Sequence, residues 1–297
     1  MSAVQQRVAI IGAGRVGTAI AFLAMQKGYE VIGLCCRTME SARRAEAFLG
    51  RDSIARDAPG PWIRDADMVL ITTPDDVIRH VCEGIVVAGF VRAGAIVAHC
   101  SGAHPSSILQ SAADAGYPIG SVHPLQSCAT RELAVTVLPG SYFCIEGSEE
   151  AKAVLRGLVQ ALGGEILEIR TDDKPLYHAG AAVASNFLVG LINFSLTLYE
   201  RIGIDRRSGI QALAPLFEGT IRNIKAVGIP EALTGPIMRG DLGTVRTHLE
   251  AITQAIPSYV PLYCALGRET VTVAKNKGTI DTAIQKAFIE LFERFGG

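Results

Sequence analysis

The sequence has almost no excess of charge of either sign. It contains 28 Lys and Arg against 29 Asp and Glu, a net charge of −1 at pH 7, and no run rich in basic residues. A chain with this balance offers no electrostatic footprint for nucleic acid or for an anionic membrane surface. We therefore expect neither a nucleic-acid partner nor a membrane partner.

Metal-ligand spacing and a secretory leader are also missing. The 7 cysteines include no CxxC pair, and their odd number leaves at least one thiol unpaired. They are Cys35, Cys36, Cys82, Cys100, Cys128, Cys144 and Cys264. After Met1 the chain enters a strand pattern almost at once, with no charged-then-apolar leader. These features predict no metal site, reduced thiols and a cytoplasmic protein.

Only one long uncharged stretch occurs, from Ala179 to Tyr199. It is long enough to cross a bilayer, but no second span of this kind accompanies it. It also contains polar residues: Ser185, Asn186, Asn193, Ser195 and Thr197. A helix that is apolar on all sides is normally buried, so we expect this one to lie between domains or subunits. A homodimer formed through the helical domain follows as an expectation.

The chain is rich in hydrophobic residues (49%). In its first half, short apolar runs alternate with stretches in which apolar residues recur at helical spacing. This alternation is typical of βα units around a doubly wound, mostly parallel sheet. Strands are expected at 7–11, 29–36, 68–72, 95–99, 119–122, 142–145 and 166–169, and helices at 14–26, 39–49, 75–87, 105–116 and 149–162. After Arg170 only helical periods remain, near 175–200, 206–226, 242–255, 258–275 and 280–294. The sequence predicts a Rossmann-type α/β domain over residues 1–170 and an all-α domain over residues 171–297.

The first βα turn carries a dinucleotide-binding fingerprint. It is the GxGxxG run Gly12-Ala13-Gly14-Arg15-Val16-Gly17, directly after a strand and at the start of a helix. The first glycine makes the tight turn, the second lets the backbone approach a pyrophosphate, and the third packs the helix closely on the sheet. The helix N-terminus then faces the phosphates. We expect all of residues 12–17 to bind a cofactor; the alternative is a glycine-rich turn without a ligand.

The end of the second strand selects the cofactor. An Asp or Glu there would bind the ribose 2′-hydroxyl of NAD, but this chain has Cys35-Cys36-Arg37-Thr38 and no carboxylate. Arg37 suits a 2′-phosphate because its planar guanidinium pairs with phosphate oxygens, and Thr38 adds a hydroxyl. The alternative is that Arg37 only ends the strand at the surface. The sequence favours NADP(H) over NAD(H).

Polar residues follow three of the expected strands: Thr72-Thr73-Pro74-Asp75, His99-Cys100-Ser101-Gly102 and Ser121-Val122-His123-Pro124-Leu125-Gln126-Ser127. Ligands of such sheets bind outside the carboxyl ends of the strands. Thr72, Thr73 and Pro74 are expected to line the nicotinamide side of the cofactor. Each run alone fits turn chemistry, but three at one edge predict a pocket.

The helix after Pro175 is expected to add side chains to this pocket. His178 and Ser185 are seven residues apart and nearly eclipsed on one helix face. Lys174 stands at the helix boundary close to that face, and Asn186 lies roughly 80° around from His178. The alternative for His178 is a buried histidine with a structural role.

With these motifs in view, the chain resembles an uncharacterised family of NADP-dependent oxidoreductases. Its members join a Rossmann-like domain to a C-terminal helical domain of unknown function. The matching segments are GAGRVG (12–17), ITTPDD (71–76), HCSGAHPSSIL (99–109), GSVHPLQS (120–127), KPLYHAGAAVASNFLVGL (174–191) and LTGPIMRGDLGTV (233–245). The resemblance covers nearly the whole chain and implies a pyridine-nucleotide enzyme.

More distantly, the layout is similar to pyrroline-5-carboxylate reductase, prephenate dehydrogenase and the 6-phosphogluconate dehydrogenase group. His123-Pro124 resembles the His-Pro of prephenate dehydrogenases. The order of Lys174 and Asn186 resembles the catalytic Lys and Asn of β-hydroxyacid dehydrogenases. The spacing here is twelve residues and not their four, which argues against a direct transfer of the catalytic lysine.

The sequence thus predicts an NADP(H)-dependent oxidoreductase that moves a hydride to or from a small polar carbonyl, imine or alcohol. Histidine suits proton transfer near neutral pH, so His123 and then His178 are the expected proton carriers. Ser101 and Asn186 are expected to hold the substrate oxygen, and Lys174 is a further catalytic candidate. The alternatives are a non-catalytic NADP-binding sensor or interaction protein, and a deazaflavin-dependent reductase.

Overall fold

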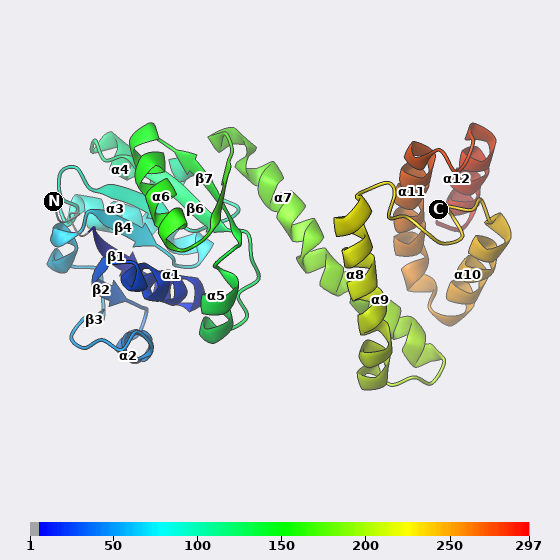
Figure 1. Cartoon of the computed structure of the whole chain (residues 1–297), viewed down its shortest axis with the longest axis horizontal. Helices are drawn as coiled ribbons and strands as arrows, with labels where there is room; N and C mark the ends of the chain where they lie inside the picture. The colour runs from blue at the N-terminus through cyan, green and yellow to red at the C-terminus, as the bar shows by residue number, and fades with distance from the viewer. Residues whose placement is uncertain (1–5, 297) are drawn as a thin grey trace. The chain divides into compact units, whose positions relative to one another are not determined.

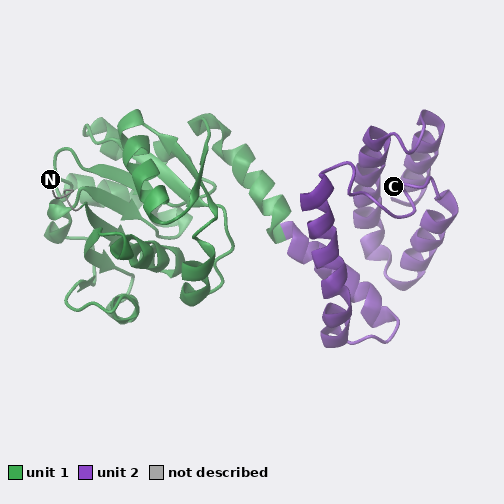
Figure 2. Cartoon of the chain, viewed as in Figure 1, with its two compact units in different colours: residues 1–186 green, residues 187–297 purple. Residues whose placement is uncertain are grey.

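The computed structural model describes residues 6–296, and the chain divides into two compact units, residues 1–186 and 187–297 (Figure 1; Figure 2). The first unit holds one eight-stranded sheet of order β3-β2-β1-β4-β5-β6-β7-β8. Its strands are β1 (Arg7–Ile11), β2 (Glu30–Cys35), β3 (Ala55–Arg56), β4 (Met68–Ile71), β5 (Ile96–His99), β6 (Ile119–Pro124), β7 (Tyr142–Gly147) and β8 (Glu165–Glu168). All neighbouring strands are parallel except β6 and β7. The predicted Rossmann-type, mostly parallel sheet is confirmed.

Side-chain alternation along the strands builds one core on each face of this sheet. In β1, Val8 and Ile10 belong to one core while Ala9 and Ile11 belong to the other, as the period of two requires. The first core is covered by α1 (Arg15–Gln26), α2 (Met39–Phe48), α5 (Arg131–Val137) and α6 (Glu149–Ala161). The second is covered by η1 (Pro61–Asp65), α3 (Ile78–Val87), η3 (Ser106–Leu109) and α4 (Gln110–Asp114). Both faces are buried, which is why these strands read as unbroken apolar runs.

The sequence missed some elements and merged two others. The short strand β3, the 3₁₀ turn η1 and the helix α5 lie in segments to which the sequence analysis assigned no helix or strand. The single helix expected near 175–200 is two helices, α7 (Lys174–Ala184) and α8 (Asn186–Arg201). The break is at Ser185, whose φ of −116° and ψ of −66° depart from helical values.

In the sequence, the boundary between the two compact units lies at 186/187, later than the expected domain boundary near 170. Strands do end at Glu168, and only helical elements follow, starting with η4 (Thr171–Asp173). However, α7 packs on the sheet domain, because Lys174 is fully buried and bonds Ser121 of β6. The candidate site residues on α7 therefore belong to the first unit.

The second unit is all-helical, as predicted. It contains α8, α9 (Arg206–Val227), α10 (Leu242–Ala255), η5 (Pro257–Tyr259), α11 (Val260–Lys277) and α12 (Thr282–Gly296). Its core is built by α10, α11 and α12, with Leu249, Phe288 and Phe292 among the buried side chains. Gly267 of α11 allows the close approach, since a Cβ there would lie 2.4 Å from the Phe292 ring.

The long apolar stretch is mostly uncovered within one chain. The helical stretch Thr171–Arg201 is long and apolar enough to cross a membrane by length and composition, and 11% of its most apolar window is buried. Phe187 and Val189 are 67% and 69% exposed. The expected burial of this stretch between domains or subunits stays a prediction.

Candidate functional site

The glycine loop joins β1 to α1 at the carboxyl edge of the sheet. The amides of Gly12 and Ala13 both donate to the carbonyl oxygen of Cys35, which closes the turn over the end of β2. Gly12 has φ +98°, and a Cβ there would lie 2.6 Å from the backbone nitrogen of Thr73. Gly14 is exposed, with only one backbone atom within 4 Å of an added Cβ. The loop thus has the tight turn and the open backbone that a dinucleotide pyrophosphate requires.

The remaining loop residues start α1. Arg15 and Val16 are its first two residues, with Arg15 exposed and Val16 partly buried. A Cβ at Gly17 would lie 2.2 Å from the Thr72 hydroxyl oxygen, so the helix lies directly against the end of β4. The N-terminal end of α1 therefore stands at the position where a phosphate gains most from the helix dipole.

The Thr72-Thr73-Pro74 run ends β4 beside this loop. The Thr72 hydroxyl donates to the carbonyl oxygen of Gly12 at 2.7 Å, so it ties the loop to β4. The Thr73 hydroxyl is buried and has no hydrogen-bond partner among residues 6–296. Pro74 is exposed and precedes the 3₁₀ turn η2 (Asp75–Val77). An orphaned hydroxyl beside an open glycine loop fits a site that a polar ligand completes.

The end of β2 carries no carboxylate, as read from the sequence. Arg37 is exposed, and Thr38 caps α2 by accepting the amide of Ser41 on its hydroxyl oxygen at 3.3 Å. The neighbouring Arg44 bonds Glu40 and Ser41 instead. Arg37 is therefore the arginine at this strand end that the described residues leave unengaged.

At the end of β5, His99 and Ser101 stabilise the loop. His99 is fully buried; its Nδ1 accepts the amide of Ser101 at 3.1 Å, and its Nε2 donates to the Pro105 carbonyl at 3.3 Å. Burial and the charge of Lys174 lower the pKa of His99 to about 3. The Ser101 hydroxyl oxygen accepts the amides of Ala103 and His104. These two bonds use the Ser101 oxygen as an acceptor and leave its O–H as a donor, so its role in holding a substrate oxygen stays a prediction.

His123, near the end of β6, is the centre of a compact aromatic cluster. Its Nδ1 is 2.9 Å from the hydroxyl oxygen of Tyr177, and its ring lies edge-on to His178 with centroids 6.0 Å apart. Gly102 makes this convergence possible, because a Cβ there would lie 2.6 Å from Cδ2 of His178 and 2.7 Å from Nε2 of His123. The structure therefore brings His123 and His178 together, and the hydrogen bond of Tyr177 with His123 joins α7 to β6.

Lys174 lies beside this cluster, with its ammonium nitrogen 5.8 Å from the centroid of the Tyr177 ring. Its side chain is fully buried, and its ammonium group donates to the hydroxyl of Ser121. Burial and the charge of Lys174, followed by that of His178, lower the pKa of His123 to about 4. Burial is therefore the main reason that His123 is neutral at physiological pH, and the charge of Lys174 adds to it.

A cavity of about 550 Å³ opens beside His123. We call it the His123 cavity; its lining includes His123, Gln126, Tyr177, His178, Ser185 and Asn186. The predicted residues His178 and Asn186 do share one cavity, although the helix breaks between them. The site thus combines an imidazole pair with hydroxyl and amide groups, which suits proton transfer to a polar substrate.

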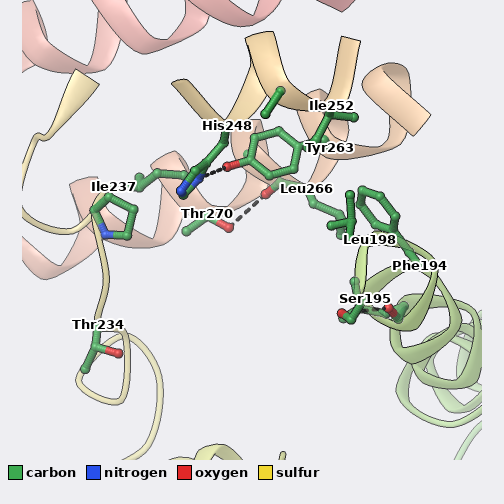
Figure 3. Close-up of a pocket in the computed structure, with 14 residues that line it drawn as sticks. Phe194, Ser195, Leu198, Thr234, Ile237, His248, Ile252, Tyr263, Leu266 and Thr270 are labelled. Carbon is green, nitrogen blue, oxygen red and sulfur yellow. Dashed lines mark hydrogen bonds between the residues drawn. The ribbon is translucent and has the colours of Figure 1, made fainter. Parts of the chain in front are cut away.

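A second cavity lies in the helical unit. We call it the His248 cavity; its volume is about 590 Å³, and Figure 3 shows Phe194, Leu198, Ile252 and Leu266 around it. The ring of His248 bonds the hydroxyl of Tyr263 at 2.8 Å (Figure 3). The cavity contains none of the residues expected from the sequence to bind cofactor or substrate.

Metal and thiol chemistry find no support in the described part of the chain. Residues 6–296 contain no group of three or more His, Cys, Asp or Glu placed to hold a metal. All seven cysteines lie within this range, and none is paired. Burial raises the pKa of Cys100 to about 12, so this thiol beside the site stays protonated and unreactive at neutral pH.

Comparison with known families agrees with this architecture. Residues 1–124 match the family described as a Rossmann-like domain, and residues 141–270 match a domain of unknown function, DUF2520. The chain joins a Rossmann-like domain to DUF2520. No protein of curated function matches the chain.

Solved structures share the fold of this Rossmann–DUF2520 protein. A Bacteroides fragilis protein assigned as an NADP oxidoreductase is 21% identical, with a TM-score of 0.71 over 90% of this chain and 98% of that chain. Protein TM1727 of Thermotoga maritima is 25% identical, with a TM-score of 0.70 over 91% and 99%. A pyrroline-5-carboxylate reductase of Coxiella burnetii is 11% identical, with a TM-score of 0.60 over 99% of each chain. The resemblance read from the sequence is confirmed.

Sequence reasoning missed Tyr177, Gly102 and the helix α5. Tyr177 precedes His178 in the quoted KPLYHAG run, and a tyrosine three residues after Lys174 on a helix was the available signal. Gly102 was read only as turn chemistry. Thr130 caps the helix α5 just before its first residue, since its hydroxyl accepts the amide of Leu133, and this threonine cap was the sequence signal of the helix.

Proposed function

We propose that this protein is an NADP(H)-dependent oxidoreductase that transfers a hydride to or from a small polar carbonyl, imine or alcohol. One observation carries the proposal: the glycine loop and His123 lie at the carboxyl ends of parallel strands of the same unit. Ligands of doubly wound sheets bind at this edge. A cofactor site and a proton-transfer group therefore share one side of the sheet.

The preference for NADP(H) rests on the end of β2. Arg37 is exposed there, and no carboxylate stands at the position where NAD enzymes bind the ribose 2′-hydroxyl. A guanidinium forms paired hydrogen bonds with phosphate oxygens and stacks on planar rings. Arg37 is proposed to bind the 2′-phosphate, with residues 12–17 holding the pyrophosphate and Thr73 and Pro74 beside the nicotinamide.

His123 is the proposed proton carrier. When bound, the nicotinamide supplies or accepts the hydride, and His123 takes or returns the proton of the substrate oxygen or nitrogen. Because its pKa is lowered to about 4, the ring is neutral at pH 7 and has one unprotonated ring nitrogen, and protonation of that nitrogen requires the negative charge that develops on the substrate. His178 and Asn186 line the same cavity and are proposed to orient the substrate polar atom.

Tyr177 is proposed to orient His123. Burial raises the pKa of Tyr177 further above neutral pH, so its hydroxyl keeps its proton throughout the working pH range. When Nδ1 of His123 carries the ring proton, it donates to the Tyr177 oxygen and leaves the Nε2 lone pair beside Gly102 and His178. In Tyr177→Phe we expect lower turnover with unchanged cofactor affinity, and a shifted pH profile.

The cofactor is tested by fluorescence titration of the purified chain with NADPH and NADH. We expect tighter binding of NADPH, and loss of this preference in Arg37→Ala. Arg64→Ala is the control, because Arg64 Nε donates to the carbonyl of Gly89, away from the glycine loop. Absence of binding of both cofactors at near-millimolar concentration would overturn the proposal.

Catalysis is tested by a screen of carbonyl, imine and alcohol substrates that follows NADPH absorbance. With a substrate in hand, His123→Ala should slow turnover by roughly 10²- to 10⁴-fold while sparing NADPH affinity. Tight NADPH binding with no turnover of any substrate would instead favour the competing function, a cofactor-binding sensor or interaction protein. Unchanged turnover in both His123→Ala and His178→Ala would contradict the assigned roles.

We also propose a homodimer formed through α8, in a cytoplasmic protein. Phe187 and Val189 are exposed on α8, which has no charged residue before Glu200, and exposure to water is unfavourable for an apolar patch of this kind. A two-fold dimer would cover the same patch on both copies. Light scattering should report a dimer for the native chain and for Val87→Glu, and a monomer for Phe187→Glu. A monomeric native chain, or one recovered with lipid vesicles, would contradict the dimer.

A further inference from the structure

The segment between β6 and β7 brings an unassigned arginine to the cofactor edge. These strands are antiparallel, with Pro124 opposite Phe143, so residues 125–141 leave and re-enter the sheet at the same carboxyl edge. The helix α5 lies in this segment and packs against α1 (Figure 1). Ala134 of α5 shares a core with Ala13 of the glycine loop. Arg131, the first residue of α5, is therefore held near the dinucleotide loop.

The side chain of Arg131 is partly buried, and its Nε has no hydrogen-bond partner in the described part of the chain. Two buried side-chain nitrogen or oxygen atoms within residues 6–296 lack a hydrogen-bond partner: Arg131 Nε and Thr73 Oγ1. Thr73 lies against the glycine loop, since a Cβ at Gly12 would lie 2.6 Å from its backbone nitrogen. A buried donor without a partner destabilises the folded chain, and a charged donor does so more than a neutral one. Each orphaned atom therefore fits a polar ligand that would supply its missing partner, and the Nε of Arg131 requires an acceptor.

The local charge indicates the sign of that ligand. The Cys36 thiol donates to the Ala13 carbonyl at 3.4 Å, so Cys36 marks the point where the end of β2 meets the loop. Burial raises the pKa of Cys36, while its bond to Ala13 and the positive charges of Arg131 and Arg44 lower it. The positive charge of Arg131 therefore acts at the loop, and we expect the partner that its Nε lacks to be an anion.

We propose that Arg131 binds a phosphate of the dinucleotide through its orphaned guanidinium edge. This inference rests on the proposed cofactor and adds to it a residue from the segment after β6, outside the first βαβ unit. Arginine pairs with phosphate through charge-assisted hydrogen bonds, which supply the acceptor that Nε lacks. Two groups of the cofactor share this chemistry, the pyrophosphate and the 2′-phosphate, and the experiment separates them.

The test is fluorescence titration of native chain, Arg131→Gln and Arg131→Lys with NADPH and with NADH. We expect about tenfold or greater weakening in Arg131→Gln, because a charge-assisted hydrogen bond is lost. Equal weakening for both cofactors assigns the pyrophosphate, and weakening for NADPH alone assigns the 2′-phosphate. Arg131→Lys should recover part of the affinity, since a point charge remains. Arg64→Gln, at an arginine that bonds Gly89, should bind as the native chain does.

Thermal unfolding supplies a readout that does not depend on turnover. Without cofactor, Arg131→Gln should be as stable as the native chain or more so, because an unpaired buried donor is removed. With saturating NADPH, its gain in melting temperature should be smaller than the native gain. If the native chain binds NADPH and Arg131→Gln binds both cofactors equally well, the inference is wrong while the proposed function stands. If the native chain binds neither cofactor, the proposed function fails and the inference with it.

Discussion

Two histidines buried in their neutral form make the stability of this protein depend on pH. Burial, with the charge of Lys174 second, lowers the pKa of His99 to about 3 and of His123 to about 4, from a model-peptide value of 6.5. Between those values and 6.5 the unfolded chain binds more protons than the folded chain. The stability contribution is therefore complete above about pH 6.5 and is lost as pH falls.

The magnitude follows from proton binding to the unfolded state. Between pH 7.5 and pH 5.5, one histidine of pKa 6.5 changes the folding equilibrium roughly tenfold when its folded form stays neutral. For His99 and His123 together the change is about a hundredfold, or about 3 kcal/mol of unfolding free energy. At pH 5.5 the carboxylates whose pKa is lowered, such as that of Asp205, remain ionised and add little.

The assay is urea unfolding at the two pH values for the native chain and for His99→Asn. Removing His99 should reduce the pH-dependent loss by about tenfold in equilibrium constant, whatever it does to stability at pH 7.5. His80→Asn, at an exposed position of α3, is the control and should keep the native pH dependence. If His99→Asn does not fold, His123→Asn tests the same term. The same pH dependence in native and variant chains would refute the reasoning.

Two further perturbations test the packing under the site. Gly12→Ala should cost more unfolding free energy than Gly28→Ala by about 1–3 kcal/mol in chemical denaturation. Both glycines have positive φ, +98° and +89°, but only at Gly12 would the new Cβ meet a neighbour, at 2.6 Å from Thr73; equal costs would contradict the close approach. Lys174→Met should raise the pKa of His123 in an NMR titration, because the second-largest cause of its lowering is removed; an unchanged pKa would show that burial acts alone.

The sequence alone determined the sheet and its cofactor edge. Local signals carried this information: apolar runs for strands buried on both faces, and glycines at spacings that only a tight turn and a helix start require. The run Val8–Ile11 followed by Gly12 and Gly14 placed β1, the loop and α1 without any long-range information. The absence of a carboxylate after Cys36 was equally local and directed the cofactor prediction.

Contacts between distant segments were decided only by the tertiary structure. The hydrogen bond of His123 with Tyr177 joins residues 54 positions apart, and no local pattern encodes such a contact. Ser101 and Lys174 illustrate the same limit, because their polar character suggested direct contact with substrate. In the structure Ser101 accepts two amides of its own loop and Lys174 is buried against Ser121, and no local pattern indicated these contacts. Spacing gives a side chain's position along its element, but burial and hydrogen-bond partners depend on the elements that pack against it.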